Sequence, residues 1–369
     1  MGAETRHRAK GGPYRPWYFA AVLFRRKGRS GGATLAERPA ESERPAASAE
    51  ELRAEIERLS KSNRASRDPD AELELLRLRH LAGIRLLDDP SPDPRHPEPD
   101  FARLPESEGL PDVAAAELTP ELLRAGILRD GSLLVRGLID REEALALAEQ
   151  VDRAFAERAR HEAGEPAADG YYAEFEPAAR FTVPLSRGWI AQGGGVLAVD
   201  SPRLAFATLD AFERAGLLGV IRGYLGEPVA LSAQKTTLRK AEPTVAGAWH
   251  QDGNFMGEVR ALNVWVSLSR CGDEAPGLDI VPRRLDDLVA AGTEGAMLSY
   301  TVTEEVVAEA AAGVPIVRPI FEPGDALLFD ELCLHQTGSD PSMPNPRYAI
   351  ESWFFGASAL PQDYAPLAV

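Results

Sequence analysis

Three side chains of types that bind metal ions are the first feature of this sequence. His250 and Asp252 lie two apart in the stretch GAWHQDGNFM, and His335 lies far downstream in DALLFDELCLHQ. Residues two apart on a β-strand point to the same face. A strand here would therefore bring His250 and Asp252 to one point, and a second strand of the same barrel would add His335.

Such a set of ligands predicts a particular chemistry. Two histidines and one carboxylate on one face of a metal are the ligands of non-haem Fe(II) oxygenases, which keep the opposite positions open. A bidentate 2-oxo acid can take two open positions and O2 the third. Arg347 begins the later stretch RYAIESWFF. A guanidinium binds a carboxylate through two hydrogen bonds and keeps its charge when partly buried, which suits the distal carboxylate of 2-oxoglutarate.

The segments that must position these residues are short, β-rich and separated by Gly, Pro, Asp and Glu. They are residues 228–240, 261–269, 278–282, 314–321, 325–336 and 347–356. In ALNVWVSLS, alternation puts Asn263, Trp265 and Ser267 on one face and the aliphatic residues on the other. Several short strands at this spacing favour a sandwich or barrel.

Helical signals dominate the chain before residue 226. Ser48 with Glu51 forms a capping box, and residues 71–87 place leucines on one face of a second helix. Asp140 and Ser201 begin two further helices. The predicted strand GSLLVRGLI precedes Asp140, and the three glycines of GWIAQGGGV predict a mobile loop. The fold is therefore predicted to be α+β, with helices around a β-barrel core.

Composition shifts divide the chain near residue 100. Residues 1–30 form a basic tail whose apolar run PWYFAAVLF is too short to span a bilayer, and a linker follows. The proline-rich DDPSPDPRHPEPD ends this part. We predict a partly disordered, helical extension over residues 1–100 and the main domain over 101–369. Removal of the extension is expected to leave a folded, iron-binding domain.

The net charge of −16 argues against a nucleic-acid binder, because phosphate neutralisation needs clustered Lys and Arg. Cys271 and Cys333 form neither a disulfide framework nor a zinc-ribbon spacing. A reducing, cytoplasmic setting without a stable membrane span is the expectation.

The ordered set WHQDG, ALNVWVSLS, GLDIVP, PGDALLFDELCLHQTG and PRYAIESWF resembles the phytanoyl-CoA dioxygenase family of Fe(II)/2-oxoglutarate-dependent oxygenases. The fold of this family is a double-stranded β-helix, a jelly-roll or cupin-like barrel. The resemblance covers roughly residues 130–357. It implies iron binding by the residues His250, Asp252 and His335.

The same resemblance implies a cosubstrate pocket. Arg347 would pair with the C5 carboxylate of 2-oxoglutarate, Thr337 would add a hydroxyl, and Trp265 would line the pocket. The family's usual PGSH-type segment is replaced by APGLDIVPRR, which affects the neighbouring loop and the substrate contacts rather than the metal ligands.

The predicted function is a dioxygenase that uses Fe(II), 2-oxoglutarate and O2 to hydroxylate a small molecule, with release of succinate and CO2. Gln234 and Asn254 are candidates for substrate contacts from their position alone. Two alternatives stay open: a cupin-type metal barrel with non-oxidative activity, and a non-catalytic relative that binds a ligand. Arg347 argues against the first, and the intact ligand set argues against the second.

Overall fold

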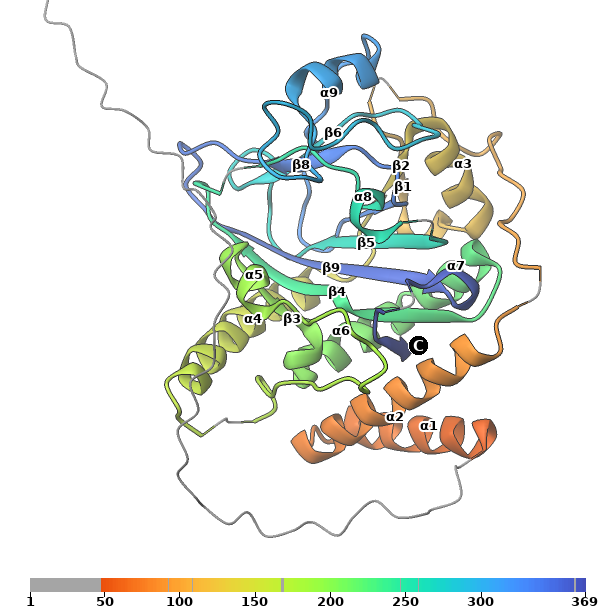
Figure 1. Ribbon diagram of the computed structural model, residues 1–369, viewed down its shortest axis with the longest axis vertical. Coiled ribbons are helices and arrows are strands. Elements are labelled where there is room, and N and C mark those ends of the chain that lie inside the picture. Colours follow the sequence, from red (N-terminus) through yellow and green to blue (C-terminus); the bar gives the residue numbers. More distant parts are fainter. Residues whose placement is uncertain are drawn as a thin grey trace, which may run out of the picture. The chain divides into compact units, whose positions relative to one another are not determined.

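The computed structural model describes residues 48–91, 93–107, 109–166, 169–245, 247–257, 259–361 and 363–369 (Figure 1). The predictions for the basic tail and linker within residues 1–47 lie outside these ranges. The helices are α1 (Ala49–Ala65), α2 (Pro69–Asp88), α3 (Pro120–Asp130), α4 (Arg141–Glu162), α5 (Arg187–Gln192), α6 (Pro202–Arg214), α7 (Leu217–Leu225), α8 (Gly253–Met256) and α9 (Glu304–Ala311), with 3-10 turns η1 (Ala115–Glu117), η2 (Ala198–Asp200) and η3 (Ala357–Ala359). Among the described residues, no helix combines the length and apolar character needed to cross a bilayer.

The strands form two sheets. They are β1 (Asp112–Ala114), β2 (Ser132–Arg136), β3 (Gly195–Leu197), β4 (Val229–Ala241), β5 (Ala261–Ser267), β6 (Gly277–Ile280), β7 (Ala326–Phe329), β8 (His335–Gly338), β9 (Arg347–Gly356) and β10 (Pro366–Ala368). The large sheet has the order β1-β2-β7-β5-β9-β4-β10, with β3 also paired to β4, and β6 pairs with β8 in a small sheet. Apart from the parallel β1–β2 pair, the paired strands run antiparallel.

The large sheet separates two apolar layers. Leu262, Val264 and Val266 of β5 face a core shared with the helices. Trp265 faces the other way, into a second cluster that also contains Trp353 of β9 and residues of the small sheet. Figure 1 shows β5, β9 and β4 side by side, with β6 and β8 on one side and α4, α6, α1 and α2 on the other. The predicted alternation in β5 and the α+β fold with a two-sheeted, barrel-like core are confirmed.

Helix α2 lies within the predicted N-terminal extension, but it packs against the main domain. The compact unit runs from Ala47 to Val369, and Leu75 and Leu76 of α2 are buried in the helix-side core. The carboxylate of Glu72, which is fully buried, accepts a hydrogen bond from Arg203 Nε at 2.7 Å. Because the leucine face needs an apolar partner, α2 packs against the sheet-and-helix core instead of standing apart at residue 100.

Two predicted strands differ in detail. Residues 314–321 form only isolated bridges, at Val317 and Phe321. The single strand expected over 325–336 is interrupted after β7, where Asp330 caps a turn by accepting the Leu332 N–H at 3.1 Å. The turn sends the chain from the large sheet into the small one, so that β8 begins at His335.

The segment GWIAQGGGV (residues 188–196) was expected to be a mobile loop. Instead, it forms most of helix α5 and then enters strand β3, which pairs with β4. Gly194 has a φ of +69°, and a β-carbon there would lie 2.3 Å from the carbonyl oxygen of Lys240. The Gly194 carbonyl in turn accepts the Lys240 N–H at 2.8 Å. A glycine is needed because the two backbones approach this closely.

Candidate metal centre

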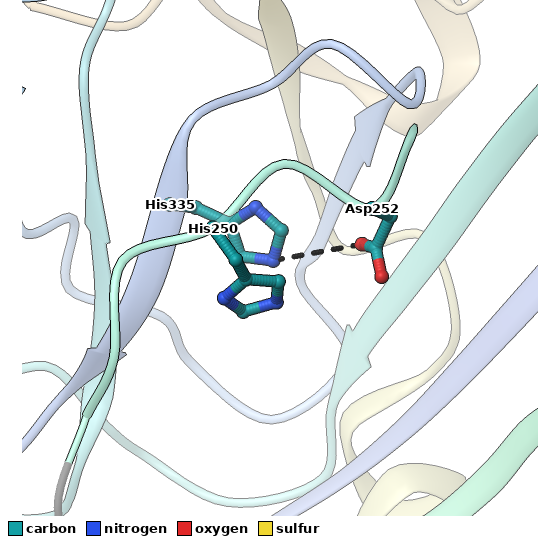
Figure 2. Close-up of side chains that lie close together, drawn as sticks. All are labelled: His250, Asp252 and His335. Carbon is teal, nitrogen blue, oxygen red and sulfur yellow. Dashed lines mark ion pairs between the residues drawn. The ribbon is translucent and has the colours of Figure 1, made fainter. Parts of the chain in front are cut away.

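The structure brings His250, Asp252 and His335 together. One potential ligand atom from each lies within 4.8 Å of the other two. Figure 2 shows the two imidazoles side by side with the Asp252 carboxylate facing them. His250 forms an isolated β-bridge, whereas Asp252 has helical angles (φ −63°, ψ −25°) and precedes α8. The predicted strand through 247–256 is therefore wrong, and a bridge followed by a turn produces the convergence.

The residue between the two ligands anchors this turn. Gln251 is fully buried, and its amide donates to the Leu332 carbonyl at 2.7 Å and accepts the Val289 N–H at 2.7 Å. The Gly253 N–H donates to the Glu331 carbonyl at 3.0 Å. These bonds hold the turn against the segment that leads into His335.

Both histidines have a defined tautomer. His250 Nδ1 lies 2.8 Å from the Ala248 carbonyl oxygen, and His335 Nδ1 lies 3.1 Å from that of Cys333. A carbonyl only accepts, so each Nδ1 carries the proton and each Nε2 keeps a lone pair for a metal. Burial, reinforced by the neighbouring His250, lowers the pKa of His335 to about 4. His335 is therefore a neutral ligand at physiological pH.

Asp252 fits the third ligand position. Its side chain is buried, and Oδ2 has no hydrogen-bond donor among the described residues. The same oxygen lies 3.9 Å from His335 Nε2. A buried carboxylate oxygen without a donor is costly, and a cation between these atoms would remove that cost. The donor set therefore fits Fe(II).

Arg347 is a buried cation on the first residue of β9. Its Nη1 donates to the Gly277 carbonyl at 2.8 Å, and its Nε has no hydrogen-bond partner. Its guanidinium carbon lies 5.4 Å from the centroid of the Trp265 ring. Within the described ranges no carboxylate lies at ion-pair distance from it. Burial lowers the Arg347 pKa to about 10, so the guanidinium stays charged and could bind an anion.

The other predicted residues lie in different settings. Thr337 lies two residues after His335 on β8 and therefore on the same strand face. It pairs with Leu278 of β6, the neighbour of Gly277, whose carbonyl accepts a hydrogen bond from Arg347. Asn254 follows Asp252 in α8, and its buried Nδ2 has no hydrogen-bond partner. Both ends of the Gln234 amide are used structurally, since Nε2 donates to the Val183 carbonyl and Oε1 accepts the Ala365 N–H.

Lys235 is a site residue that the sequence analysis missed. Its Nζ lies 3.6 Å from the centroid of the Phe255 ring, which stacks on His250 with centroids 6.4 Å apart. Burial lowers the pKa of Lys235, and the charges of Asp252 and Glu351 oppose that shift. A register shift in β4 between Leu231 and Thr236 disrupts the strand alternation, so the period of the sequence could not place this lysine.

Glu351 is a second missed residue. It lies two strand positions from Trp353 on the inner face of β9 and accepts hydrogen bonds from Arg239 at 3.1 Å and Thr237 at 3.2 Å. Burial opposes its ionisation, but the charges of Arg239 and Lys235 outweigh burial and hold the Glu351 pKa below its usual value. Lys235 and Glu351 thus line the barrel interior in addition to the three predicted metal ligands and Arg347.

Comparisons with known proteins give distant likenesses. No protein-family model matches the chain. L-proline trans-4-hydroxylase from Streptomyces griseoviridis is 26% identical over 146 residues, which are 34% of this chain and 54% of that protein. The chain thus matches about half the length of this curated relative.

Two solved structures are also similar. EctD from S. alaskensis with 2-oxoglutarate and 5-hydroxyectoine is 21% identical, with a TM-score of 0.46 over 73% of this chain and 86% of that one. The α-ketoglutarate-dependent carbocyclase SnoK from nogalamycin biosynthesis is 17% identical, with a TM-score of 0.43 over 66% and 86%.

Proposed function

We propose that this protein is an Fe(II)- and 2-oxoglutarate-dependent dioxygenase that hydroxylates a small molecule. The observation that carries the proposal is the convergence of two imidazoles with free Nε2 atoms on a buried carboxylate oxygen that has no donor. The partial similarity to an L-proline hydroxylase supports the same reaction class. Within the oxygenases, the sequence motifs favour the phytanoyl-CoA dioxygenase family.

His250, Asp252 and His335 hold the iron in this proposal. Bound Fe(II) supplies the activation of O2, coupled to conversion of 2-oxoglutarate into succinate and CO2. The chain contributes a neutral His335 that needs no deprotonation before it binds the metal. The Nδ1 hydrogen bonds keep both rings aimed at one point.

Arg347 binds the distal carboxylate of the cosubstrate. Its Nε has no partner and its guanidinium no counter-ion among the described residues, so the group is ready for an anion, and the Trp265 ring lies beside it. Thr337 adds a hydroxyl from the strand that carries His335. Lys235 adds a half-buried amine near Asp252 and Glu351, which could donate to a second acidic group of a ligand.

The substrate contacts and setting are narrower proposals. Asn254 is retained as a substrate contact because its buried amide nitrogen lacks a partner beside a metal ligand. Gln234 acts instead as a cross-link between two loops and β4. The catalytic domain includes α2 together with residues 101–369. Both buried cysteines are free, which suits the reducing cytoplasm.

Anaerobic calorimetry tests the proposal. Mn(II), as a redox-stable substitute for Fe(II), should bind with one site, and 2-oxoglutarate should then bind the metal-loaded protein. Aerobic succinate release should rise with a true substrate, for which free amino acids are the first panel. Metal-loaded protein that does not bind 2-oxoglutarate would contradict the proposal and favour a non-oxidative metal barrel.

A further inference from the structure

A hollow of about 210 Å³ lies among α1, α2, α6 and α7, in the helical layer that covers the outer face of the large sheet. This volume far exceeds the roughly 10–15 Å³ that one water needs, and it is smaller than a typical drug-sized pocket. We propose that this hollow, called here the helical cavity, binds a small organic carboxylate with an apolar body. The inference does not depend on the proposed catalytic function.

The acidic groups of the helical cavity are already paired. Arg64 donates to Asp210 Oδ1 at 2.7 Å and also pairs with Glu213. Arg67 takes the other oxygen of Asp210 at 2.9 Å. Both side-chain carboxylates that line the cavity are therefore paired with arginines of α1 and of the turn that follows it.

Two further arginines, Arg79 and Arg222, line the cavity. Arg79 of α2 donates to the Ala368 carbonyl at 2.8 Å and to the Ser60 hydroxyl at 3.4 Å, while its buried Nε has no partner. Arg222 of α7 is exposed. In the described part of the chain neither forms an ion pair with a carboxylate. The partly desolvated guanidinium of Arg79 is unfavourable without a counter-ion, so an incoming carboxylate would stabilise it.

The remaining walls are apolar. Leu75, Phe206, Leu209 and Leu218 line the helical cavity beside the arginines. A second hollow of about 20 Å³ shares Arg79, Phe206 and Leu209 with it, and its other walls are mostly apolar. The arginines thus suit the carboxylate head, and the leucine and phenylalanine walls suit a short hydrocarbon chain.

The smaller hollow borders two strands of the large sheet. Thr236 of β4 and Ser352 of β9 line it, and these residues are direct partners across the two strands. Each is the neighbour in sequence of a charged residue on the inner face, Lys235 and Glu351. The smaller hollow thus borders the two strands that carry Lys235 and Glu351.

Calorimetry of the full chain with hexanoate tests this site. We expect one saturable site in the wild type, binding about tenfold weaker in Arg222→Gln, because a charge-assisted hydrogen bond is lost. Arg79→Gln should weaken binding at least as much. Arg53→Gln is the matched control, since Arg53 is exposed on α1 and does not line the cavity. Arg347→Ala should bind hexanoate as the wild type does, which separates this cavity from the cosubstrate pocket.

Arg79 also ties α2 to the C-terminal strand, so its variant could lose stability. The exposed Arg222 avoids this problem, and an unchanged unfolding temperature verifies the fold. Wild-type affinity in Arg222→Gln, equal weakening in Arg53→Gln, or the absence of saturable binding would each overturn the proposal. Acetate or inorganic phosphate binding as tightly as hexanoate would overturn the requirement for an apolar body.

Discussion

His250 and His335 exchange two backbone hydrogen bonds: each N–H donates to the carbonyl of the other, at 3.0 and 3.1 Å. Residues paired in this way across antiparallel strands project their side chains to the same side. The two rings accordingly lie with centroids 4.5 Å apart. The two histidine ligands are thus positioned by main-chain pairing of His250 with the first residue of β8. This pairing does not require the imidazole rings.

Replacing either histidine with alanine should therefore abolish tight Mn(II) or Fe(II) binding without unfolding the protein. The backbone bridge survives the loss of the ring, whereas the metal loses one of three protein ligands. Metal calorimetry and circular dichroism on His250→Ala and His335→Ala measure both effects. His161→Ala, at an exposed position, is the control and should bind metal normally.

Asp252→Ala should abolish tight metal binding without lowering the stability of the metal-free protein. The metal-free protein carries a buried carboxylate oxygen without a donor, and an unsatisfied group of this kind costs about 1–3 kcal/mol. We expect the metal-free variant to be at least as stable as the wild type and to gain nothing from added metal. Thermal unfolding with and without Mn(II) tests this, and a clearly lower unfolding temperature of the metal-free variant would disagree.

Arg347→Ala should weaken 2-oxoglutarate binding to the metal-loaded protein by about 2–5 kcal/mol. It leaves the three metal ligands in place, so Mn(II) affinity should hardly change. Arg347→Lys keeps a charge but loses the two-pronged hydrogen-bonding geometry and should fall between the wild type and alanine. Wild-type 2-oxoglutarate affinity in Arg347→Ala would refute this assignment of the arginine.

Leu75→Ala should lower the free energy of unfolding by about 2–5 kcal/mol, because it opens a space in the helix-side core. Leu73, on the same helix, is 44% exposed, whereas Leu75 is 0% exposed. Leu73→Ala is therefore the matched control, with an effect within about 0.5 kcal/mol. Urea unfolding measures both variants.

Removal of residues 1–46 should leave folding intact, because the compact unit begins at Ala47. Removal of residues 1–100, which the sequence alone predicted to be tolerated, should instead cause aggregation, because it takes away α2 and uncovers the helix-side core.

The buried position of His80 predicts that the folded protein loses stability in acid. Its Nδ1 lies 2.8 Å from the Pro366 carbonyl, and its Nε2 accepts the Ala178 N–H at 3.0 Å, so the folded state needs the neutral ring. Burial lowers the His80 pKa. The unfolded state therefore binds more protons below about pH 6.5, and the His80 contribution to stability falls as pH drops from there. His80→Gln should flatten this pH dependence in urea unfolding, unlike His161→Gln.

Local patterns in the sequence were sufficient to predict much of the fold. The Ser48 capping box, the helix begun by Asp140 and the alternation in β5 all depend on residues close in the chain, so propensity and period predict them. Ligand types are also a local property, since two histidines and one carboxylate can be read directly from the sequence and match the ligand set of non-haem Fe(II) oxygenases.

Only the tertiary structure decided how these ligands meet. The sequence argument for convergence assumed a strand over 247–256, but contacts of Gln251 with residues 289 and 332 fold the segment into a bridge and a turn. The register shift in β4 places Lys235 at the site in the same non-local way. Likewise, the leucines of α2 are amphipathic in sequence, and the surface that they bury against comes from segments more than a hundred residues away. Such outcomes depend on long-range packing and pairing energies, which no short window of sequence contains.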